Sequence, residues 1–276
     1  MKNKRRESQS VLQYIRQTAD VDAEIDEMHD SITMYSTEAT WKDIIFTSAI
    51  RKPLLLSAAS MFLQQFSGIN CVMFYSKNIF KDAGFETDAK QQMGLLLVAG
   101  IQIIFTFISC LLIDKTGRKV LLIISTTVMC LSMITFGVYF QLTDGKDSHN
   151  LTWLALASLM VYMAAFSIGL GPIPWILMVE LIPLRAKGKC GGIVTTINLL
   201  SAFIITKEFK DLTVHITNQG TYWFFAGISF LALLFTIFLI PETKDRSLED
   251  IERSFHSQYE SISSYKADDE NAHPSA

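Results

Sequence analysis

Three side-chain amides stand close together in a stretch of the chain that carries no charge. Gln64, Gln65 and Asn70 all lie in the stretch 53–76, which contains no Asp, Glu, Lys or Arg. An amide both donates and accepts hydrogen bonds, so such a set suits a neutral solute that carries many hydroxyl groups. On a regular helix of about 100° per residue, Asn70 would lie roughly 140° around the axis from Gln65. Ser67-Gly68 offers a place where the helix can unwind, and we predict a polar site at this interruption, with contacts between packed helices as the alternative.

Further residues in other uncharged stretches predict the same kind of site. Pro172 and Pro174 in the segment GLGPIPW remove two backbone donors, so they predict a second break that acts as a gating hinge. Trp175 follows this break, and we expect its indole at the cavity. Kinked packing without function is the alternative. Gln102 and Asn198 are single amides, which serve equally well as contacts between helices.

The elements that position these residues follow from the distribution of charge. The chain has 276 residues, of which 50% are hydrophobic and 18% are charged. Six stretches contain no Asp, Glu, Lys or Arg: 53–76, 94–113, 120–142, 151–179, 190–206 and 220–240. A bilayer core is crossed by about 20 apolar residues in a helix. The sequence therefore predicts an all-α polytopic membrane protein with six transmembrane helices, and excludes a soluble enzyme or a nucleic-acid-binding protein.

Lys and Arg predict the orientation and the domain organisation. They are concentrated before residue 53, in the alternate loops 115–119 and 185–189, and after residue 240, which places both termini in the cytoplasm. We predict a cytoplasmic linker with short amphipathic helices at 1–52, with a solvated linker as the alternative. A six-helix transmembrane bundle follows at 53–240, and a cytoplasmic tail, mostly disordered, at 241–276.

Charged residues recur at the predicted cytoplasmic ends of the helices. They are Asp114, Arg118, Glu180, Arg185 and Glu242. Such residues serve as ordinary anchors at the membrane interface, or they form ion pairs that latch the cytoplasmic side and break when it opens. We favour the latch, because acid and base occur together at several helix ends.

The sequence predicts no metal, no cofactor and no catalysis. It contains no CxxC pair, HExxH segment or Gly-rich phosphate loop. The cysteines lie inside or at the edge of the apolar stretches, and we expect them to act as packing residues.

The ordered set of motifs resembles the sugar transporter family of the major facilitator superfamily. QQFSGIN with the downstream FYS, DKTGRK, GPIPW, VELIPLR and PETK occur in that family's order and at about its spacing. The most similar branches are the intracellular class of facilitative glucose transporters and the arthropod facilitated trehalose transporters. The family fold has twelve helices in two halves around a central sugar site. The resemblance implies that this chain is the C-terminal half, and that its partner is a missing N-terminal six-helix half or another copy.

The resemblance also implies roles for individual residues. Those implied to bind sugar are Gln64, Gln65, Asn70, Gln102, Trp175 and Asn198. Phe74 and Tyr75 match aromatic residues that help to close the outer gate. Asp114, Arg118, Glu180, Arg185 and Glu242 match the family's cytoplasmic ion-pair network. The chain departs from the family at Ser167, Leu199 and Asp245, and the first two bear on which sugar is preferred.

The expected function is transport of a neutral sugar, either a hexose or trehalose, by alternating access. We favour a facilitative uniporter in the plasma membrane or in an endosomal or lysosomal membrane. No carboxylate lies inside the six stretches, which argues against a carrier of organic cations or metals. Two alternatives stay open: proton-coupled sugar symport, and a truncated half-protein that does not transport.

Overall fold

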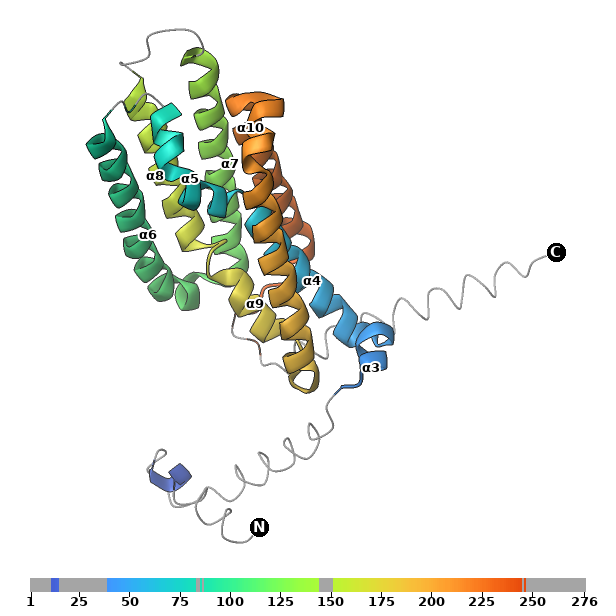
Figure 1. The fold of residues 1–276 in the computed structure, drawn as a ribbon. Coiled ribbons are helices and arrows are strands. Elements are labelled where there is room, and N and C mark those ends of the chain that lie inside the picture. The colour runs from blue at the N-terminus through green and yellow to red at the C-terminus, as the bar shows by residue number, and fades with distance from the viewer. Residues whose placement is uncertain are drawn as a thin grey trace, which may run out of the picture.

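The computed structural model of the 276-residue chain describes residues 11–14, 39–82, 85, 87–143, 151–244 and 246. Within these ranges the chain forms helices and the turns between them, with no strand (Figure 1). Residues 11–14 form one helical turn. The helices that follow are α3 (Trp41–Phe46), α4 (Ser48–Phe66), α5 (Ile69–Asp82), α6 (Asp88–Thr116), α7 (Arg118–Thr143), α8 (Thr152–Ile168), α9 (Ile173–Leu181), the 3-10 turn η1 (Leu184–Ala186) and α10 (Lys187–Leu239).

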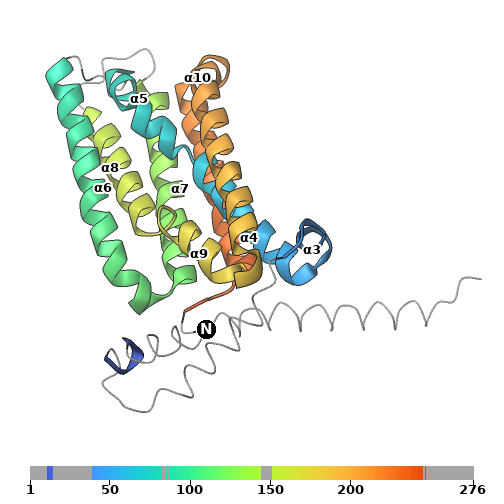
Figure 2. The ribbon, with the colours of Figure 1, turned by 60° about the horizontal axis from the view of Figure 1, so that its bottom comes forward.

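The long helices lie side by side in a bundle, with α6 at one edge and α10 at the other (Figures 1 and 2). α7 packs between α8 and α10, α8 packs also against α6, and α4 runs along α10. The main apolar core includes a set of aromatic side chains that are almost completely buried, among them Phe136, Tyr162, Tyr222 and Phe225. The rings of Phe136 and Tyr222 meet edge to face, with their centroids 4.4 Å apart. This core holds α7, α8 and α10 together.

Four helical segments of the described chain are long and apolar enough to cross a membrane. They are Asp88–Thr116, Arg118–Thr143, Thr152–Leu181 and Leu184–Leu239. The six crossings predicted from the sequence are therefore not confirmed by this count. Ser67 and Gly68 separate the first apolar stretch into α4 and α5, and the last two stretches are joined within the single assignment α10.

The helix α10 is one assignment but two arms. Its 53 residues would extend for about 80 Å if the helix were straight. Thr217 interrupts it with φ 65 and ψ 168, which is not a helical conformation. The chain reverses there, and the two arms run along the same bundle (Figures 1 and 2). Residues 207–216, which lie between the last two uncharged stretches, continue the first arm as helix.

The outer surface of the bundle is apolar. In the most apolar window of α6 only 17% of the residues are buried. Leu96, Ile103 and Phe107 are each exposed by about 70%. An apolar surface of this extent is stable only against lipid or another protein surface.

The segment that precedes the bundle is attached to its lower end. The Ala39 N–H donates to the carbonyl of Arg185 at 3.0 Å, and Lys189 Nζ donates to the Ala39 carbonyl at 2.9 Å. Ala39 and Ile44 belong to a second apolar cluster that also includes Cys190. α4 begins at Ser48, so the predicted start of the first span at residue 53 lies inside a helix. The rest of the linker at 1–52 and of the tail at 241–276, including most of the predicted amphipathic helices, lies outside the described residues.

Candidate binding cavity and Arg118 network

The predicted interruption of the first apolar stretch is present and brings its amides together. α4 ends at Phe66 and α5 begins at Ile69, with Gly68 between them at φ 95. A Cβ at Gly68 would lie 2.7 Å from the ring of Phe225, so both the backbone angle and the available space require glycine. Because the turn changes the direction of the chain, Asn70 Nδ2 reaches Gln65 Oε1 at 2.6 Å.

The second predicted interruption lies directly opposite the first. α8 ends at Ile168 and α9 begins at Ile173, so the carbonyls of this break lack part of their normal helical donors. Pro172 cannot donate to the carbonyl of Ile168, and Ser109 Oγ donates to that carbonyl instead at 2.6 Å. Pro174 likewise cannot donate to the carbonyl of Leu170. A glutamine of the first break supplies this missing donor.

Gln64 joins the two breaks. Its Nε2 donates to the carbonyls of Leu170 and Gly171, at 2.8 Å in each case. The side chain is only 2% exposed, so these hydrogen bonds form away from solvent. Tyr162 makes a second connection, since its hydroxyl donates to the carbonyl of Ser67 at 3.0 Å. The carbonyls of Leu170, Gly171 and Ser67 are therefore satisfied by a side chain of the opposite interrupted helix.

Asn198 of α10 forms hydrogen bonds with both glutamines of the first break. Its Nδ2 donates to Gln64 Oε1 at 2.9 Å, and its Oδ1 accepts from Gln65 Nε2 at 3.2 Å. Gln65 Nε2 also approaches Gln64 Oε1 at 3.3 Å. Asn198 is 3% exposed and does not line the cavity described next. In this structure it orients the two glutamines instead of facing the space that a ligand would occupy.

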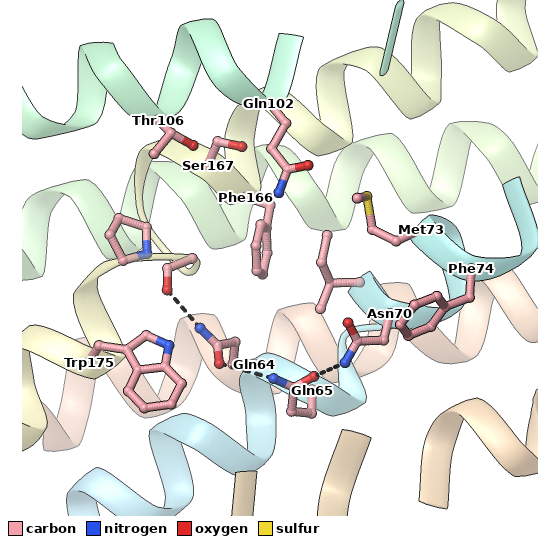
Figure 3. A pocket seen from close by; sticks show the side chains of 13 residues that line it. Gln64, Gln65, Asn70, Met73, Phe74, Gln102, Thr106, Phe166, Ser167 and Trp175 are labelled. Atoms are coloured by element: carbon pink, nitrogen blue, oxygen red, sulfur yellow. Dashed lines mark hydrogen bonds between the residues drawn. The ribbon is translucent and has the colours of Figure 1, made fainter. Parts of the chain in front are cut away.

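A cavity of about 460 Å³ opens beside the amides (Figure 3). The residues expected at the site from the sequence that line it are Gln64, Gln65, Asn70, Phe74, Gln102, Pro172 and Trp175. The lining residues that the sequence did not predict to bind sugar or to form the gate are Ile69, Met73, Thr106, Phe166, Ser167 and Gly171, of which Ser167 was named only as a departure from the family that bears on sugar preference. Helical spacing alone signals two of these, because Met73 follows Asn70 by three residues and Thr106 follows Gln102 by four.

The lining combines neutral hydrogen-bonding groups with apolar surfaces. None of its residues is charged. Trp175 lies at the rim with 40% of its surface exposed, and its indole N–H has no partner among the described residues. The ring of Phe166 lies between the amides and Gln102 (Figure 3). Such a cavity suits a neutral molecule with hydroxyl edges and apolar C–H faces, because amides bind the edges and aromatic rings cover the faces.

A second cavity of about 350 Å³ shares two lining residues with the first, Asn70 and Phe74. The predicted gate residues differ here. Phe74 is 73% exposed and borders both cavities, whereas Tyr75 lines only the second. Tyr75 is held in place, since its hydroxyl donates to the carbonyl of Thr206 at 3.4 Å and its ring stacks on Phe209 at 5.0 Å. Pro174 is buried and lines neither cavity.

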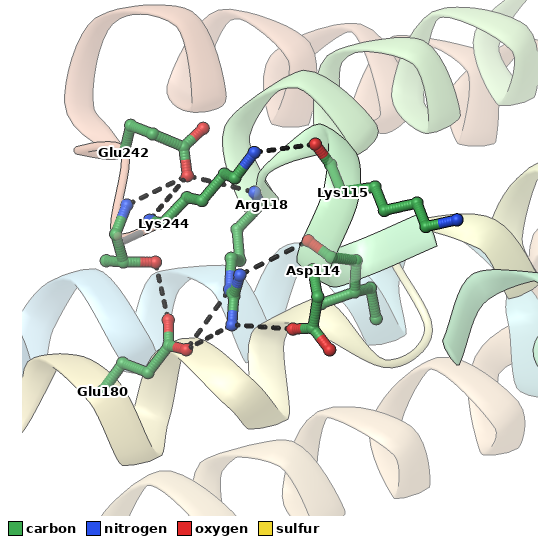
Figure 4. A network of polar contacts seen from close by, with 8 residues as sticks. Asp114, Lys115, Arg118, Glu180, Glu242 and Lys244 are labelled. Atoms are coloured by element: carbon green, nitrogen blue, oxygen red, sulfur yellow. Dashed lines mark hydrogen bonds and ion pairs between the residues drawn. The ribbon is translucent and has the colours of Figure 1, made fainter. Parts of the chain in front are cut away.

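Four of the five residues predicted to form the ion-pair network meet at one end of the bundle (Figure 4). Arg118 at the start of α7 donates from Nε and Nη2 to Glu180 Oε1 of α9, at 3.2 and 3.0 Å. Its Nη2 also lies 3.5 Å from Asp114 Oδ1 of α6. The side chains of Arg118 and Glu180 are 14% and 22% exposed, so this pair is largely shielded from water. Thr243 Oγ1 donates to the other oxygen of Glu180 at 2.6 Å.

Glu242 joins this network through the backbone. Its carboxylate accepts the N–H groups of Arg118, Lys119, Thr243 and Lys244, at distances between 3.0 and 3.2 Å. The first two belong to the N-terminus of α7, where a negative charge is favourable. Gly117 has φ 96, and a Cβ there would lie 2.8 Å from Glu242 Oε2. We call Asp114, Arg118, Glu180, Glu242 and Thr243 the Arg118 network.

Arg185 lies apart from the Arg118 network. Among the described residues no hydrogen bond or ion pair connects its guanidinium to the other four predicted members, and its Nε is buried without a partner. Its backbone carbonyl instead accepts the N–H of Ala39. The physical reason is the 3-10 turn η1, which places Arg185 at the attachment of the preceding segment.

Comparison with known proteins gives the geometry a context. The family model described as "Sugar (and other) transporter" matches residues 1–255. The facilitated trehalose transporter Tret1 of Apis mellifera ligustica is 40% identical over 258 residues, which cover 92% of this chain and 51% of that protein. The trehalose transporter 1 of Drosophila melanogaster is 42% identical over 214 residues, which cover 77% of this chain and 25% of that protein. The chain thus spans about half the length, or less, of these curated relatives.

Solved structures show the same fold. The proton:xylose symporter XylE of the major facilitator superfamily, bound to 6-bromo-6-deoxy-D-glucose, is 29% identical with a TM-score of 0.65. The match covers 73% of this chain and 42% of XylE. A double-tryptophan variant of XylE matches more of this chain, 90%, with a TM-score of 0.75 at 24% identity, and covers 51% of that structure. The described helices therefore have the arrangement of part of a major facilitator superfamily fold.

Proposed function

Because this chain belongs to the sugar transporter family, we propose that it is the sugar-binding part of a membrane carrier for a neutral sugar. The observation that carries the proposal is the amide cluster at the two helix breaks. Gln64, Gln65 and Asn70 come together from an interrupted helix and border an uncharged cavity. Interrupted helices with polar groups at the break are how many transporters build a substrate site within the membrane. The trehalose transporters among the relatives support a hexose or trehalose as the substrate.

The proposed topology has six crossings with both termini in the cytoplasm. The pair α4–α5 forms the first crossing, α6 and α7 form the next two, and the pair α8–α9 forms the fourth. The two arms of α10 form the last two, since Thr217 reverses the chain between them. The Arg118 network then lies at the cytoplasmic end, where the excess of Lys and Arg places it.

Alternating access is supported by the position of the Arg118 network. It connects the ends of α6, α7 and α9 with the segment after α10. A shielded ion pair between helix ends stabilises one arrangement of these ends and must break before they separate. Phe74 and Tyr75 are proposed to close the opposite side, and Pro172 and Pro174 to provide the hinge.

The cavity needs a second protein surface to enclose a sugar. Phe74 and Trp175 line it and remain 73% and 40% exposed. We propose that another six-helix unit covers this side, either from the same longer protein or from another copy. The rival interpretation is that these residues form a half-protein that does not transport, which the open side of the cavity also permits.

Uptake of radiolabelled D-glucose and trehalose into proteoliposomes tests this function. The protein used is the longest natural chain that contains these residues, and uptake is measured with and without a proton gradient. Uptake that does not depend on the proton gradient supports facilitative transport, which the uncharged lining of the cavity favours. Accumulation driven by the gradient supports symport. Gln65→Ala is expected to lower uptake about tenfold, since it removes several hydrogen bonds at the site.

Gln91→Ala is the matched control. Gln91 is also a buried glutamine, but its Nε2 donates to the carbonyl of Phe85 at 2.7 Å, away from the cavity. Sugar uptake per folded protein should stay at the wild-type level. If the wild-type protein takes up neither sugar, the proposed function is contradicted. If Gln65→Ala and Gln91→Ala lose uptake equally, the proposed site is contradicted.

A further inference from the structure

Among the described residues, three contacts hold the side chain of Tyr75 against α10. Its hydroxyl donates to the carbonyl of Thr206 at 3.4 Å, and its ring stacks on Phe209 with the centroids 5.0 Å apart. Lys210 Nζ lies over the same ring, 5.6 Å from its centroid. Residues 206, 209 and 210 lie within about one turn of α10, so the three contacts reach Tyr75 from one side of that helix.

These contacts keep Tyr75 out of the first cavity. Tyr75 lines only the second cavity, although its neighbour Phe74 borders both. One turn earlier on α5, Cys71 Sγ lies 3.4 Å from the carbonyl of Ile205, so α5 follows α10 over two successive turns. α5 occupies the end of the bundle opposite the Arg118 network (Figures 1 and 2). In this arrangement the Arg118 network joins the helix ends on one side, while Tyr75 is drawn away from the first cavity on the other.

Lys210 is the contact residue whose role can be tested without disturbing the core. Thr206 contributes its backbone carbonyl, and Phe209 is buried in the main apolar core. Lys210 is exposed, and within the described part of the chain its ammonium makes no ion pair. An ammonium within about 6 Å of an aromatic centroid is attracted by the negative face of the ring. This attraction adds to the hydrogen bond and the stacking that keep Tyr75 on α10.

We propose that Lys210 is a positioning residue that holds Tyr75 in its retracted position and so favours the form of the carrier that is open on its outer side. The inference rests on the proposed function, in which Tyr75 helps to close that side. To close it, Tyr75 has to leave α10, which breaks the contact with the ammonium. Lys210 therefore stabilises the open form relative to the closed form. A cation–π contact at an exposed site is weak, so the expected shift of the ratio between the two forms is about two- to fivefold.

The labelling rate of an added cysteine measures the opening of the outer side. Ala202→Cys places a thiol in the lining of the second cavity. A membrane-impermeant maleimide, added outside, reaches this thiol only in the open form. The protein is the longest natural chain that contains these residues, in right-side-out proteoliposomes without sugar, and the rate of the same protein without Ala202→Cys is subtracted.

Two variants of Lys210 test the charge. Lys210→Met keeps the aliphatic stem and removes the ammonium, and it should slow labelling by up to two- to fivefold. Lys210→Arg should restore the wild-type rate, because a guanidinium is also attracted by the ring face. Each variant is measured also together with Glu180→Gln, which weakens the Arg118 network, so that the open form no longer accounts for nearly all of the protein.

Two further comparisons show whether Lys210 acts through the ring. Lys210→Met should have no added effect in Tyr75→Leu, where the ring is absent. It should keep its effect in Tyr75→Phe, which loses only the hydroxyl. Lys81→Met is the matched control, since Lys81 is an exposed lysine of α5 without a hydrogen bond, ion pair or ring contact to any described residue. Its labelling rate should equal that of the wild type.

Four results overturn the role of Lys210. They are an unchanged or faster rate in Lys210→Met with and without Glu180→Gln, an undiminished effect of Lys210→Met in Tyr75→Leu, an equal slowing in Lys81→Met, and no labelling of Ala202→Cys from outside. Uptake of D-glucose and trehalose is measured on the same samples. If the wild type takes up neither sugar, the proposed function fails, and the labelling rates still decide whether Lys210 holds Tyr75.

Discussion

Removal of the Glu242 carboxylate is expected to release four backbone amides at the end of the bundle. In the structure Glu242 accepts the N–H groups of Arg118, Lys119, Thr243 and Lys244. Three of these bonds converge on Oε1, each at 3.0 Å, and Lys119 binds Oε2 at 3.2 Å. Glu242→Ala leaves all four donors without this acceptor, and only water can replace it.

The size of the effect follows from the charge and from the number of bonds. Hydrogen bonds to a charged group contribute about 1.5–3 kcal/mol to stability. We assume that water replaces three of the four hydrogen bonds in Glu242→Ala, so that the net loss equals the contribution of one. Local opening then becomes about ten- to a hundredfold more frequent. Glu242→Gln keeps an oxygen for the three bonds to Oε1 and loses mainly the favourable charge at the start of α7, about 0.3–1 kcal/mol. Its increase is therefore about two- to fivefold.

Hydrogen–deuterium exchange of the membrane-embedded protein measures this opening directly, because the four amides exchange only when their bonds break. Peptides covering residues 117–119 and 243–244 should exchange faster in the order alanine, glutamine, wild type. Glu208→Gln is the control, since Glu208 is 52% exposed and, within the described part of the chain, pairs only with its exposed neighbour Lys207. Equal exchange in the alanine and glutamine variants, or an equal increase in the control, would refute this account of Glu242.

Two further predictions concern the helix breaks. Gly68→Ala should lower the unfolding free energy by about 2 kcal/mol or more in a denaturation assay, because φ 95 is unfavourable for alanine and its Cβ would lie 2.7 Å from Phe225. Gly100→Ala is the control: a Cβ at Gly100 would meet no atom within 4 Å, so this change should be neutral or stabilising. A loss of unfolding free energy in Gly100→Ala as large as that in Gly68→Ala would contradict the argument. Asn198→Ala should lower the unfolding free energy by about 1–3 kcal/mol, because it removes a donor to the buried Gln64. It should also lower the affinity for sugar. A reduced affinity at unchanged stability would instead indicate that Asn198 contacts the sugar directly.

The sequence located both helix breaks because each carries a local signal. Ser67-Gly68 interrupts an apolar stretch between amides that cannot align on one helix, and Pro172 and Pro174 remove backbone donors. The interruption of α4–α5 and that of α8–α9 lie at these residues. The family was also identifiable, since its motifs depend on short segments and their order.

Contacts between distant segments were not predictable in the same way. Nothing near Asn198 indicates that it lies behind Gln64 and Gln65 instead of on the cavity wall, because this depends on the rotation of α10 against α4. Arg185 has the spacing of a network residue, yet η1 places its backbone against Ala39. Nothing in the sequence indicates that the Ser167 hydroxyl is buried without a partner, whereas the nearby Ser109 and Ser125 donate to backbone carbonyls.

The count of long apolar helices does not confirm the six predicted crossings, and the reason is geometric. Charged residues, among them Lys207, Glu208 and Lys210, separate the last two apolar stretches in the sequence. They lie on a helix that continues to Thr217, where a single residue reverses the chain. Charge marks where a segment leaves an apolar environment, but it does not mark where the helix ends.

The bonds between the two helix breaks have a consequence for biosynthesis. Gln64 is 106 residues ahead of Leu170 and 107 ahead of Gly171 in the chain. At a translation rate of 5–20 residues per second, the ribosome needs about 5–20 s to make the partner carbonyls after it has made the glutamine. During that interval the amide has no native acceptor, and an unsatisfied amide in hydrocarbon is costly. During its synthesis α4 therefore stays in contact with water, the insertion machinery or a chaperone until α8 and α9 have been made.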